Sequence, residues 1–219
     1  DIWMVSGVIV NYLQAFFFYI FGINWTSYVL HASIFNGIIS LATYFLLREF
    51  GLKIYYCFLY SLLFSLLGYT SSGTPFVDHH STFFCLLAVY SLLFVIKNEK
   101  NIFWILIPIF LGFAFLSKQV PAFYVFIILS IIITIYLFIL QKIDPLKSIL
   151  LGIILFIFFI ILLIFFGGIK FESFINQYIL YPQSIGNDRF SDFKPTFHGI
   201  VSHFKFIYIS IAPFFFINL

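Results

Sequence analysis

The feature that most constrains this chain is a series of long apolar runs separated by short polar connections. Six runs can be marked along the 219 residues, and a seventh begins near Phe204: Thr26–Leu47, Ile54–Tyr69, Thr82–Ile96, Ile102–Leu116, Ala122–Leu140 and Ile149–Phe166. A helix rises about 1.5 Å per residue, so about 20 apolar residues cross a hydrocarbon core about 30 Å thick. Only 9% of the residues are charged, whereas soluble domains have about 25%. The sequence predicts an all-α polytopic membrane protein with about six to seven transmembrane helices.

Basic residues are divided unevenly between the two sides of these spans. One group of connections (48–53, 97–101 and 141–148) contains six of them: Arg48, Lys53, Lys97, Lys100, Lys142 and Lys147. The opposite group has none in 70–81, Lys118 in 117–121, and three residues in the long segment 167–203: Lys170, Arg189 and Lys194. The positive-inside rule makes the first group cytoplasmic and the second extracytoplasmic. We therefore expect a multi-pass protein of the plasma (inner) membrane.

Net charge argues against one class of partner. The chain carries a formal charge of +3, and its basic residues are spread over loops rather than gathered on one face. Proteins that bind nucleic acid concentrate basic residues in a patch or stripe. No nucleic-acid partner is expected.

The first 25 residues can be interpreted in two ways. They are apolar enough for a span, but only Gly22–Trp25 separates them from the next one. They also contain Asn11 and Gln14, with aromatic residues of the kind found at the headgroup level: Trp3, Tyr12, Tyr19 and Trp25. We expect interfacial helices on the outer side of the membrane, with a span as the alternative.

An acid and two histidines, Asp78, His79 and His80, stand together between two apolar runs, in "TSSGTPFVDHHSTFF". A carboxylate near a bilayer is costly unless it meets water, a cation or another partner. The simpler interpretation is a helix cap, with Asp78 or Ser81 accepting from the first N–H groups of the following span. The histidines could also be amphipathic residues of the interface. Neighbouring histidines lack the i, i+4 spacing of a helical zinc site, so a divalent metal is only weakly indicated.

Two other outward segments contain candidate cations. "FLSKQVPAF" places Lys118 and Gln119 at a break before Pro121, where they could bind a phosphate; a lysine extended to the headgroups is the alternative. Arg189 in "YPQSIGNDRF" has the planar fork that suits phosphate oxygens. A surface salt bridge with Asp188 or Asp192 is its alternative role.

Ionisable residues are missing from the middle of the spans. Ion-coupled carriers usually keep such residues near the bilayer midplane, whereas the candidates here gather at the outer ends. This distribution favours an enzyme that acts at the membrane surface. No internal repeat, a common feature of membrane transporters, is visible. A structural or assembly subunit is a further possibility, and it would not need the outer Asp, Lys and Arg residues. His31, near the outer end of its span, could face the same outward-facing cavity as Asp78 and Lys118, or it could be packed and hydrogen-bonded.

Three segments resemble one family of membrane enzymes. "DIWMVSGVIVNYLQAFFFYIFGINW" resembles the "Y-x-D-x-W…G-P-L…Y…A…F…F-G" stretch of membrane-embedded C-type glycosyltransferases. These include the protein O-mannosyltransferases and the aminoarabinose lipid A transferases. "FLSKQVP" resembles their "G-L-x-x-L-(S/T)-K-x-x-P" stretch, and "PFVDHHSTFF" falls where they carry an acidic outer loop.

The resemblance implies a fold and a domain organisation. Residues 1–219 would be a single C-type glycosyltransferase-like domain, truncated at both ends. Residues 1–25 would be the end of the first outer loop, with its interfacial helices, and 167–203 a long outer loop. The main acid of the family would then precede Asp1.

The resemblance also implies a reaction. The enzyme would transfer a sugar, with inversion, from a polyprenyl-phosphate donor in the membrane to an extracytoplasmic acceptor: a protein, a lipid or a glycan. Lys118, Gln119 and Arg189 would bind the donor phosphate, and Asp78, with His79 or His80, would form a catalytic wall. No cofactor is certain, and a divalent metal is possible. The alternative to a transferase is a non-catalytic flippase or exporter of lipid-linked sugars, which would bind the lipid without cleaving it.

Overall fold

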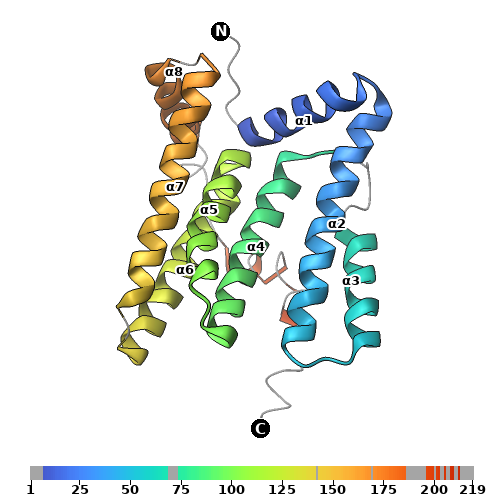
Figure 1. Cartoon of the computed structure of the whole chain (residues 1–219), viewed down its shortest axis with the longest axis vertical. Helices are drawn as coiled ribbons and strands as arrows, with labels where there is room; N and C mark the ends of the chain where they lie inside the picture. Colours follow the sequence, from blue (N-terminus) through green and yellow to red (C-terminus); the bar gives the residue numbers. More distant parts are fainter. Residues whose placement is uncertain are drawn as a thin grey trace.

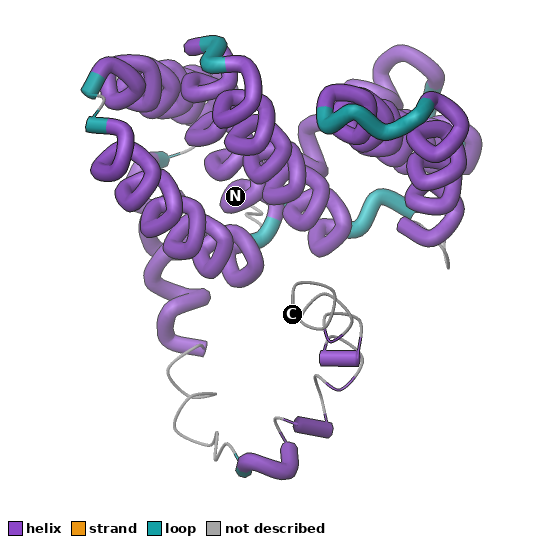
Figure 2. Tube along the Cα trace, turned by 90° about the horizontal axis from the view of Figure 1, so that it is seen from below, coloured by secondary structure: helices purple, strands orange, loops and turns teal. Residues whose placement is uncertain are grey.

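The computed structural model describes residues 7–68, 74–141, 143–168 and 170–185, and in addition 196–199, 201, 202, 205, 208, 209 and 212. These residues form helices and short connections, without strands (Figure 2). The prediction of an all-α fold is confirmed over this part of the chain. The predicted site residue Arg189 and the start of the seventh run at Phe204 lie outside the described residues.

Six of the described helices run side by side in alternating directions and form a bundle (Figure 1). They are α2 (Trp25–Glu49), α3 (Ile54–Gly68), α4 (Val77–Asn98), α5 (Asn101–Ser117), α6 (Gln119–Leu140) and α7 (Asp144–Phe166). Four of them, α2, α4, α6 and α7, are long and apolar enough to cross a membrane. This confirms a polytopic helical membrane protein. The other two have 15 and 17 residues, or about 22 and 26 Å of helix.

The connections fall at the two ends of the bundle, as alternating spans require. Arg48 and Lys53 flank the α2–α3 connection, while Lys97 and Lys100 flank the α4–α5 connection. Both connections lie at the lower end in Figure 1. The α5–α6 junction and the start of α4 lie at the upper end. The described basic loops of the first group are therefore separated from Asp78 and Lys118 by the length of the helices.

The first helix, α1 (Val8–Phe21), crosses the upper end of the bundle instead of running along it (Figure 1). Its 14 residues span about 21 Å, too little for the hydrocarbon core. It buries Val8, Val10 and Phe17, while Phe16 and Tyr19 remain exposed. The expected interfacial arrangement fits this position better than the alternative of a span.

A short turn sets the direction in which α2 leaves α1. Gly22 has φ +80°, a conformation that glycine adopts readily. Asn24 then caps α2: its Oδ1 accepts from the backbone N–H of Ser27 at 2.9 Å, and the Asn24 backbone N–H points to Ser27 Oγ at 3.4 Å. This capping box satisfies the free N–H groups at the helix start. It lets α2 begin with three residues between it and α1.

Glycines allow α7 to lie directly on α5. A Cβ atom at Gly152 would come within 2.3 Å of the carbonyl oxygen of Ile105, and one at Gly112 would come within 2.3 Å of the Phe156 ring. Small residues let membrane helices approach each other closely. Because α6 also packs on α5, α5 contacts both α6 and α7.

Candidate functional site

The end of the bundle that α1 crosses, here named the α1 end, brings three chain segments together (Figure 1). They are the start of α1, the first turn of α4 and the α5–α6 junction. The backbone N–H of Gly7, directly before α1, donates to the carbonyl oxygen of Ser117 at 2.7 Å. Gly7 has φ +79°, and a Cβ there would lie 2.5 Å from Val77 Cγ1. The start of α1 is therefore packed against both α4 and α5, where only glycine fits.

Lys118 is the single residue between α5 and α6. Its backbone is extended, with φ −156° and ψ 131°, and its N–H donates to the carbonyl oxygen of Ala114 at 2.9 Å. Gln119 already belongs to α6. Pro121 falls in the first turn of α6, where a backbone N–H has no partner within the helix. The expected break between two spans is thus confirmed, and it consists of one residue.

Asp78, His79 and His80 lie in the first turn of α4 rather than in a loop before it. The helix begins at Val77, and its N-cap is Phe76, whose side chain makes no cap hydrogen bond. The cap interpretation of Asp78 or Ser81 is therefore wrong. Asp78 still benefits from its position, because a carboxylate in the first turn interacts favourably with the helix dipole.

The Asp78 carboxylate and the Lys118 ammonium form an ion pair across the α4–α5 boundary. Their side chains are 54% and 36% exposed, so solvent reaches both groups. Two of the predicted site residues, 40 positions apart in the chain, are therefore in contact. Exposed pairs contribute little to stability, which makes this pair more important for placing its charges than for holding the fold.

Ser81, one turn further along α4, binds the backbone of the same junction. Its hydroxyl lies 3.0 Å from the carbonyl oxygen of Ala114 and 3.1 Å from that of Lys118. The Ser81 side chain is fully buried, so this contact is shielded from water. The first turns of α4 thus fix both the backbone and the ammonium of Lys118.

The two histidines of the same turn lie in different surroundings. His79 is half-buried, with its ring between those of Phe76 and Phe83 at centroid distances of 5.9 and 6.4 Å. His80 is fully buried, and its Nε2 lies 3.1 Å from Nε2 of His31, which is also fully buried. His31 is therefore packed and hydrogen-bonded, one of its two predicted environments. Since solvent does not reach His80, it can act on a substrate only through its neighbours.

Gln119 connects the junction to the segment after α7. Its Nε2 donates to the carbonyl oxygen of Tyr178 at 3.2 Å, in a short helical stretch formed by α8 (Phe171–Ile175) and η1 (Asn176–Leu180). The hydroxyl of Tyr178 donates to the carbonyl oxygen of Phe115 at 2.7 Å. Complete burial raises the pKa of Tyr178 well above its ordinary value, so it stays a neutral donor. Gln119 thus helps to dock this segment beside Lys118.

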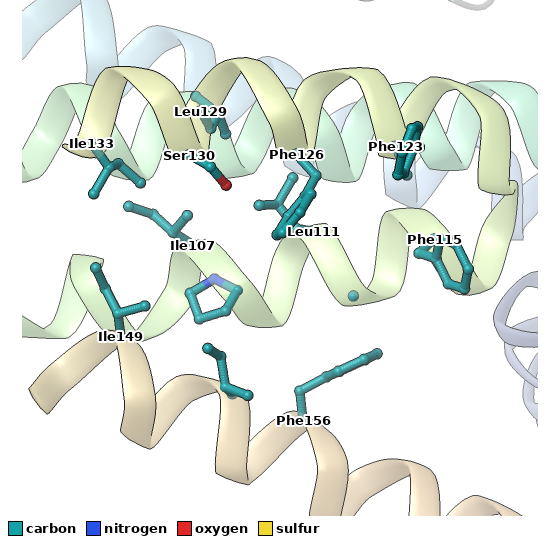
Figure 3. A pocket seen from close by; sticks show the side chains of 14 residues that line it. Ile107, Leu111, Phe115, Phe123, Phe126, Leu129, Ser130, Ile133, Ile149 and Phe156 are labelled. Atoms are coloured by element: carbon teal, nitrogen blue, oxygen red, sulfur yellow. The ribbon is translucent and has the colours of Figure 1, made fainter. Parts of the chain in front are cut away.

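An apolar groove of about 450 Å³ leads along α5, α6 and α7 (Figure 3). The residues that line it are almost all apolar: Ile107, Pro108, Leu111, Gly112, Phe115, Ala122, Phe123, Phe126, Leu129, Ser130, Ile133, Ile149, Ile153 and Phe156. Phe115 and Ala122 stand three residues before and four after Lys118. One end of the groove is therefore close in the chain to the cation at the α1 end.

Two further predictions concern Arg189 as a ligand of the phosphate and a divalent metal. Arg189 lies outside the described residues, so its relation to Lys118 is not part of this geometry. Among the residues that the structure describes, no three His, Cys, Asp or Glu side chains come together as metal ligands.

Helices long enough to cross a membrane and a polar cluster at one end of their bundle define a multi-pass membrane protein with its candidate site at the membrane surface. A family model described as dolichyl-phosphate-mannose-protein mannosyltransferase matches residues 6–165. The chain belongs to this family of membrane glycosyltransferases. No curated protein and no solved structure matched the chain.

Three features of the site were not predicted from the sequence. Ser81 was considered only as a cap, whereas it binds the α5–α6 junction. Tyr178 was one of many aromatic residues. Gln14 was noted as a polar residue in an apolar segment, and its partner is His31, with Oε1 2.8 Å from Nδ1. An isolated polar residue in an interfacial helix was the available signal for this last contact.

Proposed function

We propose that this protein transfers a sugar from a polyprenyl-phosphate carrier to an acceptor hydroxyl on the extracytoplasmic side of the membrane, with inversion at the anomeric carbon. The observation that supports this most strongly is the solvent-accessible Asp78–Lys118 pair beside the end of an apolar groove. A lipid phosphate needs both an apolar channel for its chain and a cation for its headgroup. Family membership supports a lipid-linked donor.

The reaction has simple charge requirements. The bond between the anomeric carbon and the phosphate oxygen breaks, and a bond to the acceptor oxygen forms. The acceptor proton goes to a carboxylate, and the departing polyprenyl phosphate gains negative charge. A cation near the phosphate stabilises that charge as it develops, and proton removal contributes typically 10²- to 10⁴-fold.

Each site residue has a role in this proposal. Lys118 binds the donor phosphate, assisted by Gln119 and by Arg189 from the long segment. Asp78 orients Lys118 and the acceptor, while the resemblance assigns proton abstraction to a different acid of the family. His79 lines the same wall, and His80 supports it from the buried side. These roles do not require a divalent metal.

The groove accommodates the lipid in this proposal. Its lining is apolar apart from the Ser130 hydroxyl, so an isoprenoid chain buries its surface there without leaving polar groups unpaired. Phe115 and Ala122 would contact the isoprene units nearest the phosphate. The phosphate would then lie within reach of the junction.

The test uses the full-length protein in membranes with radiolabelled polyprenyl-phosphate sugars, and it follows release of the free polyprenyl phosphate. Asp78→Asn and Lys118→Ala should each reduce release strongly while the protein still inserts at normal abundance. Near-normal release by both variants would remove the assignment of these residues. Tight donor binding without release, across a panel of protein, lipid and glycan acceptors, would favour the flippase.

A further inference from the structure

A chain of buried polar side chains joins α1, α2 and α4 behind the Asp78–Lys118 pair. Oε1 of Gln14 lies 2.8 Å from Nδ1 of His31, and Nε2 of His31 lies 3.1 Å from Nε2 of His80. Nδ1 of His80 lies 3.0 Å from the carbonyl oxygen of Phe76. All three side chains are buried. Each of these contacts is a hydrogen bond, so one of its two heavy atoms must carry a proton and the other must accept it.

The Phe76 carbonyl oxygen, at one end of this series of hydrogen bonds, fixes the positions of the protons. A backbone carbonyl only accepts, so His80 must carry its proton on Nδ1 and donate to Phe76. In a neutral His80 ring, Nε2 is then an acceptor. His31 must donate to it from Nε2, which leaves Nδ1 of a neutral His31 as an acceptor as well. Gln14 must therefore present its amide N–H₂, not its oxygen, to His31.

A second observation also favours the turned orientation of the Gln14 amide. In the orientation above, Nε2 of Gln14 has no hydrogen-bond partner within the part of the chain that the structure describes. A half-turn of the amide lets Nε2 donate to Nδ1 of His31 and moves the oxygen to the unpaired position. A buried carbonyl without a donor is tolerated better than a buried N–H without an acceptor.

The alternative to two neutral rings is a His31–His80 pair that carries a third proton, so that one ring is an imidazolium. That state would place a positive charge in a fully buried position, where an unpaired charge is very costly. Neither ring has a carboxylate among its described hydrogen-bond partners. Aromatic rings surround the pair instead: Phe17 stacks on His31 at 5.0 Å, and Phe35 lies 4.7 Å from the His80 ring centroid.

We infer that Gln14, His31 and His80 are positioning residues, joined in a neutral chain that runs from the Gln14 amide through His31 Nε2–H and His80 Nδ1–H to Phe76. This chain sets the first turn of α4 against α1 and α2. Asp78 stands two residues before His80 in that turn, so the chain also sets Asp78 against Lys118. Its effect on sugar transfer rests on the proposed function; its proton positions do not.

The first test is independent of activity. The protein is labelled with ¹⁵N-histidine and examined by solid-state NMR in bilayers, with the His31 and His80 signals assigned by their loss in His31→Gln and His80→Gln. We expect His80 to be protonated at Nδ1 alone and His31 at Nε2 alone. A doubly protonated ring, or Nε2–H on both residues, would overturn the inference.

The second test measures positioning. Gln14→Met and His31→Met remove the hydrogen-bonding groups while nearly keeping side-chain volume, and we expect kcat to fall roughly 10- to 100-fold with the donor KM changed less than about twofold. Tyr90→Phe is the matched control. It removes a buried hydrogen bond of 2.9 Å to Thr43, which joins α4 to α2 as the His80–His31 contact does. Equal losses in all three variants would mean that only general packing matters. If wild-type protein releases no polyprenyl phosphate, the proposed function fails, while the NMR result still decides on the chain.

Discussion

The hydroxyl of Ser81 reaches the carbonyl oxygen of Lys118 at 3.1 Å, one turn along α4 from the carboxylate that pairs with the Lys118 ammonium. One helix therefore fixes both the backbone and the side chain of the residue between α5 and α6. The buried contact sets where the junction lies, and the accessible ion pair sets where its charge points. The two contacts can be separated by mutation.

Ser81→Ala should loosen the junction. The change removes a buried donor from two carbonyl groups, which should lower the free energy of unfolding by about 1 kcal/mol. It should also reduce sugar transfer, because the Lys118 backbone loses its fixed position. Ser91→Ala is the control, since Ser91 donates to the carbonyl oxygen of Leu87 in its own helix. Thermal unfolding in detergent and release of polyprenyl phosphate are measured together; equal effects of the two changes would contradict the role of Ser81.

Asp78 and Lys118 should be coupled in transfer but hardly in stability. In a double-mutant cycle of Asp78→Asn and Lys118→Met, we expect a stability coupling below about 1 kcal/mol, as for other exposed pairs. Each single variant should lose roughly 100-fold or more in transfer, and the double variant should be little worse than either. Lys147→Met breaks the exposed Asp144–Lys147 pair at the other end of the bundle and should leave transfer unchanged. Additive losses in transfer would contradict a joint role.

Filling the groove should exclude long donors. Ser130→Phe places a ring among the groove residues, so the KM for a polyprenyl-phosphate sugar should rise at least about tenfold, as several buried methylene groups are each worth about 0.8 kcal/mol. A short-chain donor with one or two isoprene units should be used as well as by the wild type. Thr134→Phe, one turn along α6 and outside the groove lining, is the control. An unchanged KM in Ser130→Phe would mean that the lipid lies elsewhere.

Gly152→Ala should separate α5 from α7. Its new Cβ would meet the Ile105 carbonyl oxygen at 2.3 Å, and a backbone atom cannot move aside as a side chain does. We expect a lower midpoint of thermal unfolding in detergent. Gly37→Ala has nothing within 4 Å of its new Cβ and should be neutral or slightly stabilising. A Gly152→Ala protein as stable as the wild type would contradict the close contact.

The sequence was sufficient to predict the helices, because a bilayer imposes a length and a composition on each helix that crosses it. The six predicted runs match α2–α7 with ends within five residues. The largest errors lie at α4 and α7, whose first turns contain Asp78 and Asp144. Charged residues in a first turn do not look apolar, yet they suit the positive end of a helix dipole. For the same reason the Asp78–His80 stretch was predicted in a loop.

The site was predicted only in part because its contacts join distant positions. Asp78 and Lys118 could be named from their chemistry and their common side of the membrane. Their direct pairing depends on how α4 packs on α5. The contacts of His31 and His80, 49 positions apart, depend on three elements at once. No local spacing encodes such contacts, so the residue types were visible and their partners were not.

The one-residue junction at Lys118 also limits how the chain can change in length. An insertion or deletion between Ser117 and Gln119 would shift and rotate α6 relative to α5, since Lys118 alone connects the two helices. The groove lining contributed by α6 would then face away from α5, and the ammonium would leave Asp78. The α2–α3 connection, from Phe50 to Lys53, has four residues between its helices, and we expect it to tolerate such a change better. At the α1 end the number of residues is itself part of the site, whereas at the opposite end the loops have room to lengthen.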